Sequence, residues 1–76
     1  PRIRKSRDVL GGEARIRDTR IPVWLLSRFL ALGRTKKDLL RDYPGLTPED
    51  LAAVERYAEK FPQEIKDAIA ANEADS

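Results

Sequence analysis

The chain has 76 residues, of which 41% are hydrophobic and 37% are charged. This length and composition are typical of one small soluble domain with a single modest core. Cysteine, histidine and methionine are absent from the sequence, so disulfides, thiol chemistry and metal sites built from cysteine or histidine are excluded.

The net charge of +2 hides an uneven distribution along the chain. Residues 1–36 contain ten Lys or Arg and three Asp or Glu, a net of +7, whereas residues 37–76 contain five and ten, a net of −5. This asymmetry suggests a basic end that binds a polyanion and an acidic end that binds something else. The alternative is a solvated surface whose polarity has no functional meaning.

Nothing in the sequence predicts a membrane protein. The longest apolar run covers residues 23–26, which is far too short to span a bilayer. No signal peptide is visible either. We therefore expect a cytoplasmic protein with no membrane partner.

Residues 1–21 predict a basic strand or a β-hairpin. Residues 1–8, PRIRKSRD, are either a disordered arm or an edge strand, and Gly11 and Gly12 supply the positive φ angles of a turn. Residues 13–21 then alternate. One side of this strand carries Ala14, Ile16 and Asp18, and the other carries Arg15, Arg17, Thr19 and Ile21. A strand with unpaired edges in so small a protein suggests that this segment forms the interface of a homodimer.

Four helices are expected after the strand. Apolar spacing predicts helices over residues 22–32, 36–43, 48–61 and 62–72. The strand ends before Pro22, since a residue that precedes proline avoids the α region, and the proline suits a first helical turn. Gly33 should end the first helix. Thr35 and Thr47 are suitable N-caps, the former with Asp38 in a capping box.

The predicted fold is therefore mainly α. It consists of an N-terminal β-hairpin or strand pair, a trihelical core over residues 22–61 and a short C-terminal helix with a tail over residues 62–76. Within the core, two helices joined by a tight Pro-Gly-Leu turn fit a helix-turn-helix unit.

A helix-turn-helix unit suggests binding to duplex DNA. In this interpretation the 48–61 helix enters the major groove, where Arg56 is its candidate for base recognition, and the preceding helix contacts phosphates. The phosphate-binding candidates of that preceding helix are Lys36, Lys37 and Arg41. Glu49, Asp50 and Glu55 argue against this simple version, because acids at the start of a recognition helix repel phosphates.

Much of the expected DNA affinity is therefore assigned to the N-terminal cations. The candidates are Arg2, Arg4, Lys5, Arg7, Arg15 and Arg17. The alternative interpretation is that these charges protect an edge strand from aggregation.

The sequence shows no catalytic constellation. Histidine and cysteine, the common general base and the best nucleophile, are missing. The carboxylates lie at helix starts and on polar faces, where capping and solubility explain them, and there is no phosphate-cradling G-x-x-x-x-G-K loop. We expect no enzyme activity, no cofactor and no metal.

The last helix carries an apolar stripe that continues from the 48–61 helix across Pro62. Its members are Phe61, Ile65, Ala68 and Ile69. One interpretation is that the stripe docks on the protein's own core. The other is that it binds a protein partner and becomes fully ordered only in that complex.

Two segments resemble a known bacterial and archaeal family, the antitoxin-like family catalogued as domain of unknown function four-three-three. They are GGEARIRDTRIPV at residues 11–23 and LLRDYPGLTPEDLAAVERYA at residues 39–58. The matching positions are Gly11, Gly12, Ile16, Thr19, Arg20, Ile21, Pro22, Val23, Gly33, Tyr43, Pro44, Leu46, Thr47 and Asp50. Ala14 and Asp18 stand where the family pattern has proline and glycine.

The resemblance implies a function as well as a fold. The family is similar to helix-turn-helix antitoxins that are encoded beside PIN-type ribonuclease toxins. It implies a homodimer that represses its own operon by binding an operator and that neutralises such a toxin. Two alternatives stay open: a protein-interaction module that does not bind DNA, and a stand-alone helix-turn-helix transcription factor.

Overall fold

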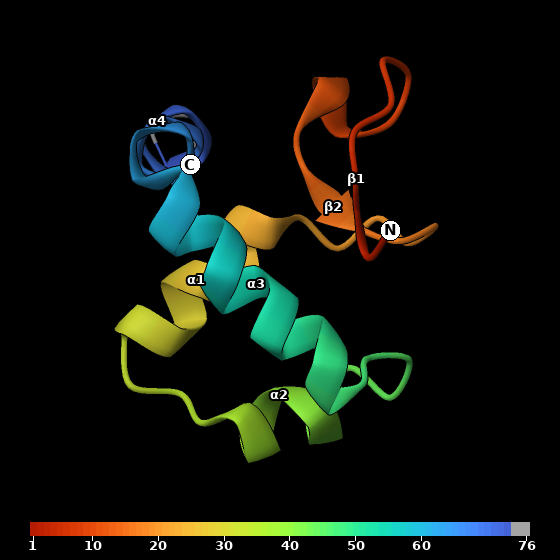
Figure 1. Ribbon diagram of the computed structural model, residues 1–76. Helices are drawn as coiled ribbons and strands as arrows, with labels where there is room; N and C mark the ends of the chain where they lie inside the picture. The colour runs from red at the N-terminus through yellow and green to blue at the C-terminus, as the bar shows by residue number, and fades with distance from the viewer. Residues whose placement is uncertain (74–76) are drawn as a thin grey trace.

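The computed structural model describes residues 1–73, which form two short strands and four α-helices (Figure 1). The elements are β1 (Ile3–Arg4), the 3-10 turn η1 (Leu10–Gly12), β2 (Arg15–Ile16), α1 (Val23–Ala31), α2 (Lys36–Asp42), α3 (Pro48–Lys60) and α4 (Pro62–Glu73). The fold is mainly α with an N-terminal strand pair, as the sequence predicts.

The predicted strand pair is confirmed, but its two strands are shorter than expected and a long connection joins them. β1 and β2 are antiparallel, with Ile3 opposite Ile16 and Arg4 opposite Arg15, and ten residues separate them along the chain. The predicted 13–21 strand stops at Ile16 because Arg17 has a φ of 41°, which is incompatible with a strand. Residues 17–20 form a turn instead.

The first helix begins and ends by two different devices. Pro22 is extended, with φ −75° and ψ 146°, so it is the N-cap of α1 and not its first helical residue. At the other end, Gly33 has a φ of 97°, its N–H donates to Leu30 and the N–H of Arg34 donates to Phe29. This pattern is a Schellman motif, and it explains why glycine follows the helix.

The second and third helices both begin with a capping box. The Thr35 hydroxyl accepts from Asp38 N–H at 3.0 Å, and the Asp38 carboxylate accepts from Thr35 N–H at 3.1 Å. Thr47 and Asp50 repeat the arrangement at the start of α3, at 3.2 and 3.0 Å. These local signals fix where both helices begin.

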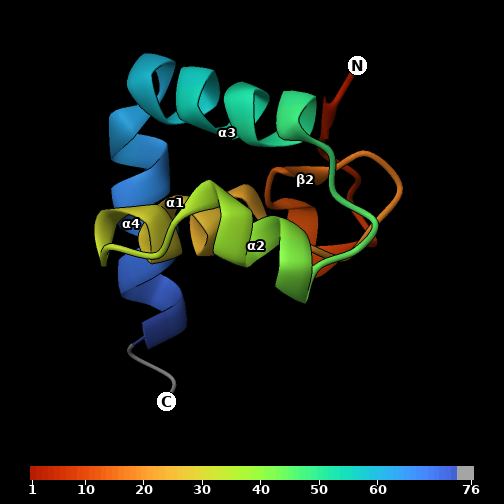
Figure 2. The ribbon, with the colours of Figure 1, turned by 90° about the horizontal axis from the view of Figure 1, so that it is seen from below.

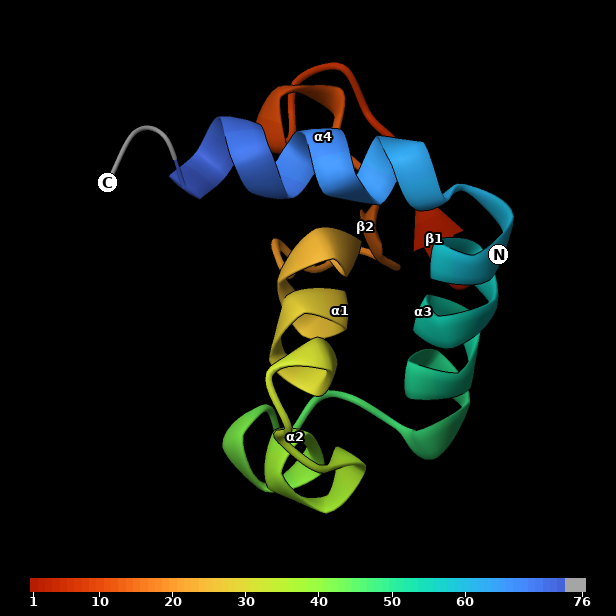
Figure 3. The same ribbon diagram turned by 90° about the vertical axis from the view of Figure 1, so that its left-hand side faces the viewer.

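The helices enclose a core that continues into the strand pair. α1 packs against α3 and α4, and α2 lies beside α1 on the side opposite to α4 (Figures 2 and 3). The fully buried apolar side chains come from β2, α1, α2 and α3, and they are Ile16, Val23, Leu26, Leu39, Leu51 and Val54. Ile65 of α4 is also buried in this core.

The two leucines Leu26 and Leu32 test how far the core stabilises the fold. Leu26 is fully buried in α1, whereas Leu32, just after that helix, is 64% exposed. Leu26→Ala should lower the free energy of unfolding by about 2–5 kcal/mol, because it leaves a cavity. Leu32→Ala should change it by less than about 0.5 kcal/mol. Urea unfolding measures both, and equal losses would contradict this arrangement of the core.

Candidate functional site

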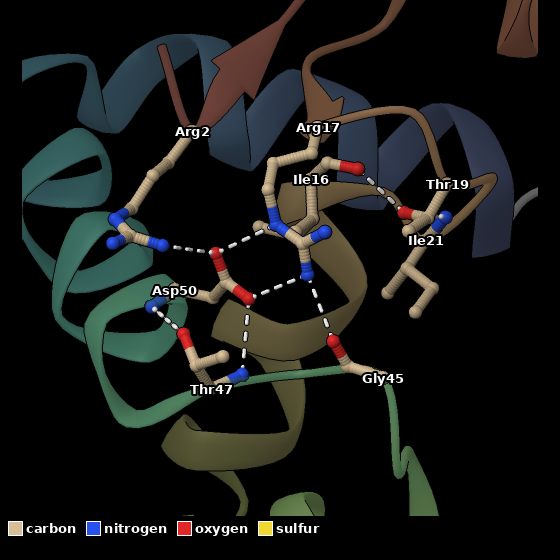
Figure 4. Close-up of polar contacts among 8 residues, drawn as sticks. All are labelled: Arg2, Ile16, Arg17, Thr19, Ile21, Gly45, Thr47 and Asp50. Atoms are coloured by element: carbon tan, nitrogen blue, oxygen red, sulfur yellow. Dashed lines mark hydrogen bonds and ion pairs between the residues drawn. The ribbon is translucent and has the colours of Figure 1, made fainter.

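A buried carboxylate joins the N-terminal strands to the helix pair α2–α3. Asp50 at the start of α3 has no exposed surface. Its Oδ1 accepts from Arg2 Nη1 and from Arg17 Nε, both at 3.1 Å, and its Oδ2 accepts from Arg17 Nη2 at 2.8 Å (Figure 4). Together with the N–H of Thr47, these donors satisfy both oxygens. We call Arg2, Arg17 and Asp50 the Asp50 cluster.

The cluster keeps the carboxyl group ionised. Hydrogen bonds from Arg17 are the main reason that the pKa of Asp50 lies far below its usual value, and they outweigh the burial that would raise it. Asp50 in turn raises the pKa of Arg17. The expectation that Asp50 repels phosphates is therefore corrected, because its charge is buried and neutralised by two arginines.

Arg17 also fixes the turn between the two helices. Its Nη2 donates to the backbone oxygen of Gly45 at 2.8 Å, in the connection between α2 and α3 (Figure 4). Nearby, the Thr19 hydroxyl donates to Ile16 O at 2.6 Å and accepts from Ile21 N–H at 3.1 Å. The joint between β2 and α1 is thus rigid, and it holds the helix-turn-helix unit against the strands.

The N-terminal cations do not form one free basic surface. Arg4 pairs with Asp18 at 2.9 Å, and Lys5 pairs with Glu64 of α4 at 2.9 Å. Among the six N-terminal candidates, only Arg7 is exposed and lacks an ion pair within residues 1–73.

Arg15 requires a correction. It was expected on an accessible side of the strand, but it is only 7% exposed, and its Nη1 atom has no hydrogen-bond partner in the described part of the chain. The cause is the local geometry: the chain returns after the turn, so that Pro22 lies beside Arg15, in place of one long alternating strand. In this conformation Arg15 is not available to DNA.

The cations of the helix-turn-helix unit divide into paired and unpaired groups. Lys36 pairs with Glu55 of α3 at 2.6 Å, and Arg41 lies near Asp38 and Asp42. Lys37 and Arg56 are exposed, and neither has an ion pair within residues 1–73. Arg56 and Lys37 are therefore the candidates of this unit that remain open to an external anion.

The predicted partner-binding stripe of the last helix is divided by the fold. Ile65 is buried, Ile69 is half-buried against the core, and Ala68 is half-buried beside the smaller pocket along α4. This burial supports the interpretation in which the helix docks on its own core, so Ile65 offers no surface to a partner in this conformation. Phe61 differs, because it is 40% exposed.

Phe61 belongs to a groove that the sequence did not reveal. The groove has a volume of about 590 Å³ and lies between the N-terminal strand and α3. It is lined by Pro1, Arg2, Ile3, Ala53, Arg56, Tyr57, Lys60 and Phe61, and we call it the β1–α3 groove. Cations and aromatic rings alternate along α3 here, a signal that is visible in the sequence but that also fits an ordinary amphipathic helix.

A smaller pocket of about 210 Å³ lies beside α4. Its polar groups are occupied internally: Glu13 accepts from Trp24 Nε1 and Asn72 Nδ2, and Glu64 accepts from the Tyr57 hydroxyl and from Lys5. Within residues 1–73 no group of three or more acidic residues could hold a metal ion. No helix of that part of the chain is long and apolar enough to cross a bilayer.

Comparison with known proteins identifies the family. Residues 3–58 match the family described as "Protein of unknown function (DUF433)". The chain belongs to the DUF433 family. The crystal structure of a DUF433 member from Anabaena variabilis has 49% sequence identity and a TM-score of 0.88, covering 91% of this chain and 68% of that one.

Another relative of this chain is longer. The uncharacterized protein y4eO of Sinorhizobium fredii is 33% identical over 60 residues, which are 79% of this chain and 27% of that protein. The chain thus spans about a quarter of the length of this relative. The DUF433 match includes the whole Asp50 cluster except Arg2, and it ends before Lys60 and Phe61.

The Asp50 cluster predicts a specific loss of stability in acid. The pKa of Asp50 is lower in the folded protein than in the unfolded one, where it is about 3.9. The ionised carboxylate therefore stabilises the folded state above about pH 3.9, and this stabilisation is lost as the pH falls towards the pKa of the folded state. Asp50→Asn should cost about 1.5–3 kcal/mol at neutral pH. The difference from the unmodified protein should shrink below about pH 4, as urea unfolding at several pH values would show.

Asp18→Asn is the matched control for this measurement. Asp18 also pairs with an arginine, but its side chain is 79% exposed. An exposed pair contributes less than about 1 kcal/mol, so this variant should unfold almost as the unmodified protein does. A pH-independent difference for Asp50→Asn would show that the carboxylate does not act through its ionisation.

Proposed function

We propose that this protein is a DNA-binding helix-turn-helix protein that acts as the antitoxin of a type II toxin–antitoxin system. The supporting observation is the α2–α3 pair, which is capped at both starts, held against the N-terminal strands by the Asp50 cluster, and exposes Lys37 and Arg56 without acidic partners in residues 1–73. A rigid pair of helices with free cations is what docking into a major groove requires.

The structure refines which cations serve this proposal. Arg2 and Arg17 both form ion pairs with Asp50. If either arginine turned to a DNA phosphate instead, the buried carboxylate of Asp50 would lose one of its partners, which is costly. The pairs of Arg4, Lys5 and Lys36 are exposed, and such pairs contribute little, so phosphates can replace their carboxylates. Lys37, Arg56 and Arg7 have no ion pair within residues 1–73, so they can contact a phosphate without giving up a carboxylate partner.

The proposal includes a homodimer. Two helix-turn-helix units at a fixed spacing read two half-sites of an operator, and the rigid joint between β2 and α1 would hold that spacing. Residues 1–21 remain the proposed interface. Deleting residues 1–12 is a poor test, because the deletion also removes Arg2 from the Asp50 cluster and Ile3 from the side of the core. Sedimentation of the intact chain over a range of concentrations tests the dimer directly.

DNA binding by α2 and α3 gives a distinct signature for each cation. Lys37→Gln should weaken binding to all duplexes alike and lower the slope of log affinity against log salt by about 0.9, as expected for one lost phosphate contact. Arg56→Gln should instead cost about 1–3 kcal/mol and relax the preference for one base pair. Titration of several duplexes at two salt concentrations measures both effects.

Lys66→Gln is the control for these substitutions. Lys66 is exposed on α4 and carries the same charge, without an ion pair in residues 1–73. Its loss should leave affinity and sequence preference nearly unchanged. If Lys37→Gln and Arg56→Gln behave as this control does, DNA does not dock on α2 and α3.

The antitoxin part of the proposal is supported by the resemblance to antitoxins of PIN-type ribonucleases. The gene adjacent to this one in its own genome should encode such a ribonuclease, and the two proteins should co-purify when they are co-expressed. The complex should also cleave RNA more slowly than the free ribonuclease. If the adjacent ribonuclease neither binds the protein nor is inhibited by it, the antitoxin part of the proposal is wrong. The protein would then be a DNA-binding regulator without a toxin partner.

One observation favours a second candidate function, a protein-interaction module. The β1–α3 groove exposes aromatic and cationic side chains together, and surfaces with that composition are enriched at protein interfaces. The two functions share Arg56, which lines the groove and is also the proposed base-reading residue of α3, so DNA and a protein bound in the groove would compete for this side chain.

A further inference from the structure

We propose that the β1–α3 groove binds an extended peptide of a protein partner, in which acidic side chains alternate with apolar ones. This inference rests on the part of the proposed function that includes a protein partner, and it names the surface to which that partner would bind. It does not depend on DNA binding.

The open edge of β1 can pair with a peptide backbone. Arg17 N–H donates to Arg2 O at 2.8 Å, so these two residues form a hydrogen-bonded pair of the antiparallel ladder. The next residue of the strand, Ile3, is then a non-hydrogen-bonded position, whose N–H and C=O point away from β2. Ile3 lines the groove, across from residues of α3. A strand added there would be hydrogen-bonded as in other cases of β-augmentation.

The floor of the groove suits apolar side chains. Ala53 and Tyr57 contribute to it from α3, and Phe61 contributes from the C-cap of that helix. The Tyr57 and Phe61 rings are 4.7 Å apart, and Phe61 is 40% exposed although it is one of the largest apolar side chains in the protein. Covering such a ring removes apolar surface from water, which is the main source of affinity at protein interfaces.

The charges select an acidic occupant. Arg56 and Lys60 line the groove, and none of its lining residues is acidic. Arg56 has no ion pair in residues 1–73, and the Lys60 amine lies 5.5 Å from the centre of the Phe61 ring, where a carboxylate can reach it. Two cations at the rim of an apolar floor match a peptide whose acids alternate with apolar residues, because alternate side chains of a strand face opposite ways.

The same charges disfavour two other occupants. The N-terminal strand of a second copy is itself basic, so Arg56 and Lys60 would repel it. A nucleic acid strand needs a succession of cations along its phosphates, but Arg2, the third cation of the groove, is held by Asp50. The pocket beside α4 is a weaker candidate, because its carboxylates already have internal partners.

A defined peptide tests the proposal on the protein of residues 1–76. The probe is the fluorescein-labelled, end-blocked peptide Glu-Val-Glu-Phe-Asp-Val, whose anisotropy reports binding. We expect saturable binding that is lost when lysine replaces each acid. Binding should also be lost when proline replaces the first valine, because proline removes a backbone donor from the added strand.

Substitutions in the groove locate the binding. Phe61→Ala should weaken the peptide about tenfold, and Lys60→Gln should weaken it about threefold, with Lys66→Gln as the charge-matched control. Melting curves establish that each variant is folded, since Lys60 and Phe61 are exposed and contribute little to the core. Phe61→Ala removes no charge and should keep the DNA affinity of the unmodified protein, so this test and the test of DNA binding can fail separately.

Three outcomes would overturn the proposal. The first is binding of the lysine peptide as tightly as the acidic one. The second is an unchanged peptide affinity in both Phe61→Ala and Lys60→Gln. The third is tighter binding of a labelled oligothymidylate than of the peptide, with loss of that binding in the same two variants, which would assign the groove to single-stranded nucleic acid.

Discussion

The buried carboxylate of Asp50 is the interaction on which the arrangement of this protein depends. It ties together three segments that are remote in the sequence: the N-terminal strand through Arg2, the turn after β2 through Arg17 and the start of α3. An unpaired carboxylate at this depth would be costly, whereas here both oxygens are satisfied by arginines and by a backbone amide. Its role is to fix position, because a buried ion pair by itself is weak evidence of high stability.

Arg17 shows how that constraint shapes the backbone. Its φ of 41° is unfavourable for a residue with a side chain. The same conformation ends the strand, begins the turn to Pro22 and directs the guanidinium group towards both Asp50 and Gly45. Several charge-assisted hydrogen bonds offset this local strain. The turn between α2 and α3 is consequently held from outside the helix pair, which gives the proposed DNA-binding unit a fixed orientation.

The distribution of free charge also follows from internal pairing. The basic N-terminal segment resembles an arm for binding polyanions, yet most of its cations have carboxylate partners elsewhere in the fold. The exposed cations that have no ion pair within residues 1–73 are scattered over the surface, and they include Arg7, Arg20, Lys37, Arg56 and Lys66. Net charge along the sequence is therefore a poor guide to the electrostatic surface, because pairing redistributes it in three dimensions.

The sequence by itself determined the parts whose causes lie within a few residues. The capping boxes at Thr35 and Thr47, the glycine after α1 and the apolar spacing of the helices depend on partners three or four positions apart, so their order and approximate bounds could be predicted. The two motifs that resemble the family were sufficient to name it, because each is long and their order matches. The charges of the candidate residues were also known, although their surroundings were not.

Only the tertiary structure decided which of those candidates are accessible. Arg17 and Asp50 are 33 positions apart and Arg2 and Asp50 are 48 apart, so no local pattern links them. The burial of Arg15, the docking of Ile65 and the groove beside Phe61 likewise depend on how the strands and α4 pack around α1 and α3. Residue types set the chemistry that each side chain can perform, whereas packing between distant segments sets which side chains meet each other and which meet a partner.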